Sequence, residues 1–360
     1  MKIGIYSPYV PKQLGGGEKY IFDVARMSIE LGHSVTFLLS EQVPEDVRSK
    51  YEKFLGVSLE DVQFTQSPIG SSASFFKKLK ATQNFDVLYL VTDGSLFLSL
   101  ARKNVVHIQI PFTQQKKSLI ERVKLWNWSV KNTNSAFTKA VVEKAWNVTI
   151  PFVHYPMIEL PEATYESKNK EKIILSVGRF FDHLHSKRQD VMVEAFRQLI
   201  RQFPNEAKRW KLILVGPVED KAYADKIANL AKDLPVEILH NATRKELETL
   251  YSNATFYWHA AGFEVQELLH PEKVEHFGIS TVESMNYGCV PIVLGKGGQV
   301  EVLGNELKAL LWESVDQLVN LTASLISDKE KQKAYAVLAV QRSKNFNKAK
   351  FVSTLKEMLR

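Results

Sequence analysis

The chain has 360 residues, 45% of them hydrophobic, which is enough to bury substantial cores and favours about two domains. Its single cysteine, Cys289, excludes an intramolecular disulfide and a cysteine-based zinc cluster, and we expect it to be a small buried residue at a strand start. The net charge of +7 favours anionic partners, such as nucleotide sugars or anionic lipid surfaces. Zinc-finger spacing, an aromatic RNA-binding signature and an isolated basic tail are all missing, so we expect no nucleic-acid partner.

The apolar stretches of the sequence are short. The longest, such as residues 87–91, fall well below the roughly 20 residues that a membrane-spanning helix needs. Pro8 interrupts the first apolar segment and no small-residue cleavage site follows, so the beginning of the sequence predicts a strand and not a signal peptide. We therefore expect a cytoplasmic protein.

The first forty residues predict an opening βαβ unit of a doubly wound domain. Residues 2–7 form the first strand, 18–31 the helix and 34–39 the second strand. The intervening Gly15-Gly16-Gly17 run lacks the spacing of a dinucleotide-binding fingerprint. Gly16 and Gly17 would let the backbone approach a ligand closely at the carboxyl end of the strand, and a flexible turn is the alternative.

Two more buried strands are predicted at residues 86–91 and 104–110, with His107 near the end of the second. A histidine among apolar residues is as often a core residue as a functional one. Residues 113–131 combine five basic residues with Trp126 and Trp128, which favours a helix suited to an anionic membrane surface. A helix packed on the sheet with solvated lysines is an equally good interpretation. Residues 75–80 (FFKKLK) repeat this composition on a shorter scale.

A second series of alternating strands and helices follows a charged linker at residues 161–172. Strands are predicted at 173–180, 212–217, 236–240 and 254–260, separated by helices at 190–203, 222–233 and 245–251. The pattern predicts two Rossmann-like domains in an α/β protein. We place the first at residues 1–160, joined by a returning helix at about 345–360, and the second at 161–344.

The segment EHFGISTVE places Glu275 and Glu283 eight positions apart. Gly278, followed by Ser280 and Thr281, is typical of a helix start, so we expect Glu275 in a loop and Glu283 in the first turn of a helix that runs to about residue 287. The four backbone N–H groups after Gly278 would then be unpaired at the positive end of the helix dipole. This geometry suits an anionic ligand such as a diphosphate.

Two cations flank the predicted first strand–helix turn of the second domain. Arg179 lies at the end of the strand and Lys187 lies just before the helix, so together they could neutralise a departing diphosphate. The spacer FFDHLHS separates them, and the neighbouring Arg188 is an alternative to Lys187. Surface charges on a loop are the alternative interpretation. An Asp-x-Asp metal motif is missing, so we expect neither a metal nor a cofactor apart from the donor substrate.

Residues 258–304 resemble the retaining GT-B glycosyltransferases of family 4, whose E-x7-E motif matches Glu275 and Glu283. The resemblance extends through Phe277-Gly278-Ile279, residues 283–291 and Gly297-Gly298, and residues 132–138 with 153–160 resemble the end of that family's first domain. It implies a GT-B fold, with a cleft between two facing Rossmann-like domains. It also implies transfer of a hexosyl group, such as mannosyl, from a GDP- or UDP-linked sugar to a glycan or lipid-linked acceptor in cell-surface polysaccharide or glycoconjugate synthesis.

The resemblance also assigns roles to residues. Arg179 and Lys187 would stabilise the leaving diphosphate, Glu275 would hold the sugar hydroxyls, His107 would contact the sugar or acceptor across the cleft, and Glu283 would accept from the ribose. The donor-binding set it implies comprises Gly16, Gly17, Phe277, Gly278, Ile279, Ser280, Thr281 and Glu283. A lipid-linked acceptor would place the protein on the inner face of the membrane. A nucleotide-sugar epimerase and a non-catalytic nucleotide-sugar-binding subunit are the alternatives.

Overall fold

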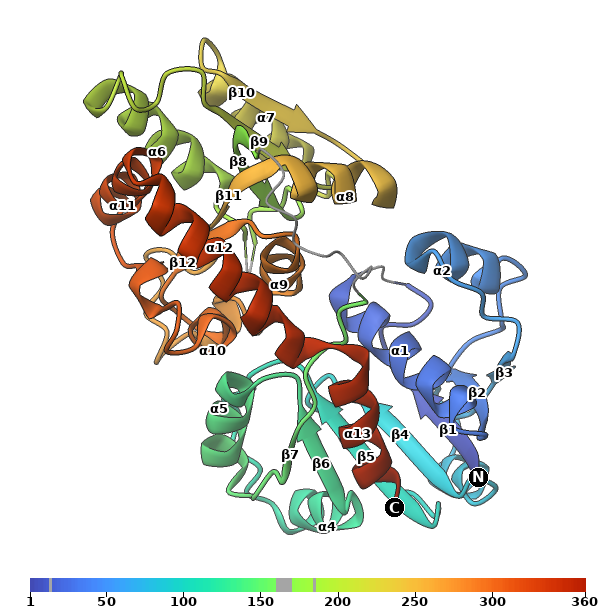
Figure 1. Cartoon of the computed structure of the whole chain (residues 1–360). Helices are drawn as coiled ribbons and strands as arrows, with labels where there is room; N and C mark the ends of the chain where they lie inside the picture. The colour runs from blue at the N-terminus through green and yellow to red at the C-terminus, as the bar shows by residue number, and fades with distance from the viewer. Residues whose placement is uncertain (13–14, 160–169, 184–185) are drawn as a thin grey trace. The chain divides into compact units, whose positions relative to one another are not determined.

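The computed structural model describes residues 1–12, 15–159, 170–183 and 186–360 (Figure 1). The chain forms two compact units. Unit 1 contains Met1–Met157 and Lys348–Arg360, and unit 2 contains Ile158–Asn347. The sequence predicted that the first domain ends at residue 160 and that its returning helix begins at about residue 345. Of the predicted linker at 161–172, residues 161–169 lie outside the described residues, and a strand already begins at Glu171.

Unit 1 is built on a parallel sheet of seven strands in the order β3-β2-β1-β4-β5-β6-β7. The order reverses between β1 and β4, so the chain winds outward in both directions from the centre, as in doubly wound folds. Strands such as β4 are continuous apolar runs because both faces of the sheet are covered. The bounds are β1 (Lys2–Tyr6), β2 (Ser34–Leu39), β3 (Val62–Gln66), β4 (Val87–Val91), β5 (Lys103–Ile108), β6 (Val130–Thr133) and β7 (Phe152–Val153).

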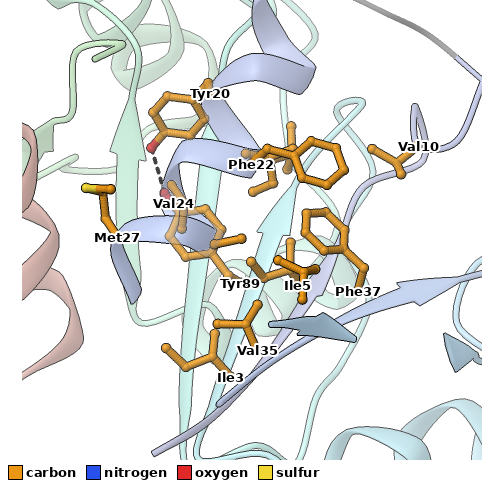
Figure 2. Packing of buried hydrophobic residues seen from close by; sticks show 14 of the residues in the cluster. Ile3, Ile5, Val10, Tyr20, Phe22, Val24, Met27, Val35, Phe37 and Tyr89 are labelled. Carbon is orange, nitrogen blue, oxygen red and sulfur yellow. Dashed lines mark hydrogen bonds between the residues drawn. The ribbon is translucent and has the colours of Figure 1, made fainter. Parts of the chain in front are cut away.

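Two separate cores cover the faces of this sheet. The larger joins the sheet to α1 (Gly16–Glu30), α2 (Val47–Leu55) and α13 (Lys348–Leu359). Figure 2 shows its centre, where the Phe22 and Phe37 rings stack 4.5 Å apart and the Tyr20 and Tyr89 hydroxyls lie 2.7 Å apart. The second core lies beneath α4 (Leu119–Asn127) and α5 (Ala136–Trp146). The short helix α3 is Phe75–Thr82.

Unit 2 has a parallel sheet of six strands in the order β10-β9-β8-β11-β12-β13. Its order reverses between β8 and β11. The strands are β8 (Glu171–Val177), β9 (Lys211–Val215), β10 (Val236–Leu239), β11 (Ala254–His259), β12 (Val290–Leu294) and β13 (Leu311–Trp312). The helices are α6 (Gln189–Gln202), α7 (Lys221–Ala231), α8 (Arg244–Asn253), α9 (Ile279–Asn286), α10 (Gly298–Leu303), α11 (Val315–Ser327) and α12 (Lys329–Ser343), with short 3₁₀ turns η1 (Pro271–Lys273), η2 (Lys308–Leu310) and η3 (Lys344–Phe346).

The predicted class, an α/β protein with two Rossmann-like domains, is confirmed by these two sheets. The prediction of one helix over residues 113–131 was wrong in extent. A capping box between Ser118 and Glu121 starts α4, and the chain leaves helical geometry at Trp128 before β6 begins at Val130. Helix α2 and strand β3 were not predicted from the sequence. Cys289 is buried directly before β12, as expected. Within the described residues, no helix is both long enough and apolar enough to cross a bilayer.

Candidate functional site

The carboxylate of Glu275 lies at the centre of a polar cluster in unit 2. Its Oε2 atom pairs with the ammonium of Lys187 and accepts a hydrogen bond from His259 Nε2 at 3.0 Å. Three separate elements supply these groups, because Lys187 lies two residues before α6, His259 ends β11 and Glu275 lies in the loop before α9. The side chains of Glu275 and His259 are 16% and 2% exposed. The cluster is therefore preorganised at the carboxyl edge of the sheet.

The electrostatics of the cluster keep Glu275 ionised. Burial alone would raise the pKa of this carboxyl, but the charge of Lys187 and the hydrogen bonds from His259 and Lys187 hold the pKa of Glu275 well below its usual range. Burial lowers the pKa of His259, against the opposing effect of Glu275. A neutral imidazole that donates from Nε2 has an acceptor at Nδ1. That atom is buried and has no hydrogen-bond partner among the described residues.

Helix α9 begins immediately after this cluster. Gly278 caps it with a φ of 111°, a conformation that favours glycine, and no side chain caps the helix. The first helical bond joins Val282 N to Gly278 O at 3.1 Å, so three N–H groups precede it and not the predicted four. Because the helix starts at Ile279, Glu283 lies in its second turn and not in its first. A Cβ on Gly278 would clash with the side chain of Gln299, which donates to Thr281 Oγ1 at 3.0 Å.

Two further glycines fix the backbone of the cluster. Gly298, the first residue of α10, donates from its N–H to Glu275 O at 2.8 Å, and a Cβ on either Gly297 or Gly298 would clash with the backbone at residues 275–277. Glu267 accepts from Gly297 N at 3.0 Å. Only glycine allows this close approach, which explains the Gly-Gly pair in the motif.

Glu283 is held by partners that the sequence analysis did not foresee. Its two carboxylate oxygens accept from Arg244 Nη1 at 2.6 Å and from the Tyr251 hydroxyl at 3.1 Å. Arg244 is the first residue of α8, so Glu283 links α8 to α9. Nearby, Tyr257 donates to Ser280 Oγ at 2.7 Å. A ribose hydroxyl bound by Glu283 would have to share this carboxylate with Arg244.

The two predicted cations, Lys187 and Arg179, contact different acidic residues in the structure. Lys187 reaches Glu275, and its aliphatic chain packs against Gly178 so closely that a Cβ there would clash with it. Arg179 instead donates from Nη1 to both oxygens of Glu219 at 3.1 Å, and its side chain is 36% exposed. Of the spacer between the cations, residues 184–185 lie outside the described residues.

Arg188 is anchored away from the cluster. It donates to Phe263 O at 2.9 Å and to Glu264 at 3.2 Å, and it pairs with Asp190 at 3.1 Å. These contacts tie the loop after β11 to the start of α6. The geometry therefore favours Lys187 over Arg188 as the residue that acts beside Glu275.

His107 lies in the interior of unit 1. Its ring is fully buried, stacks on Tyr20 at 3.8 Å and donates from Nδ1 to Asn132 Oδ1 at 2.5 Å. Burial lowers the pKa of His107 to about 3. In this structure His107 thus occupies a core position, as the alternative interpretation has it. The Nε2 atom of the ring is buried and has no hydrogen-bond partner among the described residues. The contact of His107 with a sugar or acceptor stays a prediction.

The predicted glycine pair lies at the start of α1. Gly16 is its exposed first residue, and the place of a side chain on Gly17 is taken by Gln109 from the segment after β5. Phe277 is buried against Phe346, with ring centroids 5.2 Å apart, so that only its backbone is suited to a ligand. Ile279 is half-buried.

His259, Arg244 and Tyr257 were not predicted from the sequence. His259 is the last residue of a buried strand and His107 is the last but one of another, and this similar position was the available signal. Arg244 carried no signal, because its partner Glu283 is 39 positions away. Within the described ranges, no group of three or more His, Cys, Asp or Glu side chains could hold a metal ion.

The chain thus consists of two Rossmann-like units, and a cluster of basic and acidic side chains lies at a strand–helix junction of unit 2. Solved structures with this fold align over the whole chain. They include TarM (TM-score 0.76, 9% identity, 98% of that chain), the lipopolysaccharide outer core galactosyltransferase WaaB (0.66, 14%, 99%) and the pneumococcal O-GlcNAc transferase GtfA in complex with UDP and GlcNAc (0.69, 12%, 99%). These likenesses establish the GT-B fold.

The family follows from the sequence of unit 2. Residues 159–339 match the model described as glycosyl transferases group 1, and the chain belongs to this family. Its relatives include enzymes named GDP-Man:Man(3)GlcNAc(2)-PP-Dol alpha-1,2-mannosyltransferase. The Neurospora crassa enzyme is 28% identical over 195 residues, covering 46% of this chain and 33% of the relative. The Xenopus laevis enzyme is 24% identical over 316 residues, covering 76% and 62%. The chain thus spans a third to three fifths of these relatives.

Proposed function

We propose that the chain is a retaining, metal-independent glycosyltransferase of the E-x7-E type. It transfers a hexosyl group from a nucleotide-diphospho-sugar to a glycan or lipid-linked acceptor in glycoconjugate synthesis. The single observation that carries this proposal is the cluster of Lys187, His259 and Glu275 beside the N-terminus of α9. It combines a cation, a fixed carboxylate and helix N–H groups within one unit.

The leaving diphosphate is stabilised by Lys187 and the start of α9. An ammonium has three N–H donors, and the pair with Glu275 uses one of them, so donors remain for phosphate oxygens. The N–H groups of the first helical turn and the helix dipole add to this stabilisation. Arg179 joins them by exchanging or sharing its contact with Glu219. Negative charge grows on the diphosphate as the glycosidic bond breaks, so these contacts act mainly on the transition state.

Glu275 positions the sugar and does not act as the base. A carboxylate whose pKa is well below its usual range is a weak proton acceptor, and here one oxygen already binds two donors. Its remaining acceptor capacity suits sugar hydroxyls. The acceptor hydroxyl attacks the face from which the diphosphate leaves. Its proton passes to the departing phosphate oxygen, and the anomeric configuration is retained.

The donor and acceptor that we favour are a GDP-linked mannose and a lipid-linked saccharide. The support comes from the printed names of the relatives, which specify GDP-mannose and a dolichol-linked oligosaccharide. A UDP-linked donor is the second candidate, because the structural neighbour GtfA was solved with UDP and GlcNAc.

The test is a screen of GDP-, UDP- and ADP-linked sugars by thermal shift, followed by product analysis with lipid-linked saccharide acceptors. A donor present at a hundred times its Kd would stabilise the fold by about 2.7 kcal/mol, which is readily seen as a rise in Tm. The anomeric configuration of the product is then read by NMR. An inverted linkage would overturn the retaining mechanism.

Controls separate the remaining alternatives. Conversion of the donor sugar to an epimer without any acceptor would favour the epimerase interpretation. Nucleotide-sugar binding without turnover by any acceptor would favour a non-catalytic subunit. The Glu275→Gln variant keeps the size of the side chain but removes its charge, and we expect it to bind the nucleoside diphosphate while losing turnover.

A further inference from the structure

Unit 1 exposes an unusual concentration of large apolar side chains. Of fourteen large hydrophobic side chains exposed in the described residues, seven lie in α3, α4 and the loop that precedes β5. Six of these are on the two helices: Phe75, Phe76, Leu119, Ile120, Val123 and Trp126. Phe76 and Trp126 are 78% and 82% exposed. Scattered exposed residues need no explanation, but a concentration of them on elements that are joined to one another indicates an interaction surface.

Hydrogen bonds join the two helices through the loop between them. Thr82, the last residue of α3, accepts from Leu100 N at 2.7 Å. Asn127, the last residue of α4, accepts from Ser99 N at 2.8 Å and donates to Ser99 O at 3.0 Å. The exposed Leu100 therefore lies between the two helix ends. We call α3, residues 99–100 and α4 the α3–α4 surface.

Helix α4 carries apolar residues on two sides. Leu125 is buried in the core of this face, and Trp128 directly after the helix is buried and donates to Phe97 O at 2.7 Å. The exposed residues Leu119, Val123 and Trp126 follow each other at intervals of four and three, which is one helical stripe. The helix is thus anchored by one side while a second apolar stripe faces solvent.

The charge on these segments has one sign. Residues 75–82, 95–103 and 113–131 together contain ten basic residues and one acidic residue, Glu121. Glu121 is engaged by Ser118 and Lys116, and Arg102 pairs with Asp86. The other exposed cations of α3, α4 and the segment before α4 are Lys77, Lys80, Lys117 and Arg122.

We propose that the α3–α4 surface docks on an anionic lipid bilayer, with the exposed aromatic and aliphatic side chains entering the interface. Basic residues that surround apolar and aromatic side chains are the composition of interfacial helices, whereas nucleic acid would not favour the aliphatic stripe. Both helices follow strands of the parallel sheet, so they begin at its carboxyl edge, where open sheets bind ligands, and end at its amino edge beside Leu100. If the proposed lipid-linked acceptor is correct, docking would hold unit 1 at the membrane that contains it. Membrane binding itself does not depend on the acceptor.

Two double variants test the surface, and a third serves as a matched control. Phe76→Ser with Lys77→Glu changes α3, and Arg122→Glu with Trp126→Ser changes α4. The control, Lys53→Glu with Phe54→Ser, changes an exposed adjacent Lys-Phe pair on α2, which packs on the other core of the sheet. Thermal unfolding and donor-induced Tm shifts establish that each variant is folded and still binds nucleotide.

The assay is co-sedimentation with phosphatidylcholine vesicles that contain rising fractions of phosphatidylglycerol. We expect wild-type binding to strengthen as the fraction of anionic lipid rises and to weaken as salt is added. Removal of each engaged basic side chain should weaken binding by about fivefold. Each α3 or α4 variant should bind at least about tenfold more weakly, since an inserted aromatic side chain is lost too. The control should bind like wild type.

The fluorescence of Trp126 gives an independent measurement of vesicle binding, because the other five tryptophans are at most 2% exposed. Vesicle binding should shift tryptophan emission to shorter wavelength, and Trp126→Phe should abolish the shift while preserving binding. Equal binding of wild type and both surface variants would overturn the inference. So would a lack of binding to every vesicle composition, which would point to a protein partner instead. An α3 or α4 variant that loses vesicle binding but still binds the donor would show that the two kinds of binding are independent. The membrane inference and the proposed function can then fail separately.

Discussion

Replacing Lys187 by Met removes the cation beside Glu275 and keeps the aliphatic chain that packs on Gly178. Loss of one preorganised charge contact to the departing diphosphate should reduce kcat by about 10²- to 10³-fold. The side chains of the pair are 17% and 16% exposed, so breaking it should destabilise unit 2 by less than the ~3–5 kcal/mol typical of fully buried pairs. Because Lys187 lowers the pKa of Glu275, its removal should raise that pKa and shift the acid limb of kcat/KM to higher pH.

The matched comparison is Arg188→Met. Arg188 binds Phe263 O, Glu264 and Asp190, so its loss should lower the Tm more than it lowers kcat. The measurements are steady-state kinetics over a range of pH and thermal unfolding of both variants. If folded Lys187→Met retained near wild-type turnover while folded Arg188→Met were inactive, the assignment of the cation would be wrong.

Three further predictions rest on other features. Donor turnover should persist in excess EDTA, and loss of activity that Mg²⁺ or Mn²⁺ restores would refute metal independence. Gly278→Ala should cost about 1–3 kcal/mol and weaken donor-induced Tm shifts, since its φ of 111° and the adjacent Gln299 disfavour a side chain. Burial lowers the pKa of His107 and His154 to about 3, whereas unfolded histidine titrates near 6.5. The unfolded state therefore binds more protons below about pH 6.5, and stability should fall by about 1.4 kcal/mol per pH unit for each histidine as the pH drops toward 3. Unfolding of His107→Gln between pH 7 and 5 should show a shallower loss, and an unchanged slope would contradict the prediction.

The fold was predictable because strands buried on both faces appear as short apolar runs between helices of ordinary length. The start of α9 was predictable to within one residue, because Gly278 and the polar residues after it act locally. Local signals do not reveal partners. Lys187 and Glu275 are 88 positions apart, and only the meeting of β11, α6 and the loop before α9 brings them to His259.

Trp126, within α4, and Trp128, directly after it, give a second example of what local sequence signals do not reveal. Trp126 is 82% exposed and Trp128 is fully buried, although both follow the same basic segment. Their fates differ because the helix ends at Asn127, so that Trp128 turns into the core and bonds Phe97 O. Helical periodicity alone could not locate that end.

Helix α13 has a consequence for biosynthesis. It contributes Phe351, Leu355 and Met358 to the core that contains Tyr20, yet all of unit 2 is translated between β7 and this helix. A ribosome therefore completes the continuous segment that forms unit 2 before unit 1 can close its larger core. The N-terminal unit, which usually folds first during synthesis, would here fold last, with an apolar face of α1 and the sheet uncovered until then. We expect nascent chains halted before residue 348 to hold a folded unit 2 beside a unit 1 that binds chaperones.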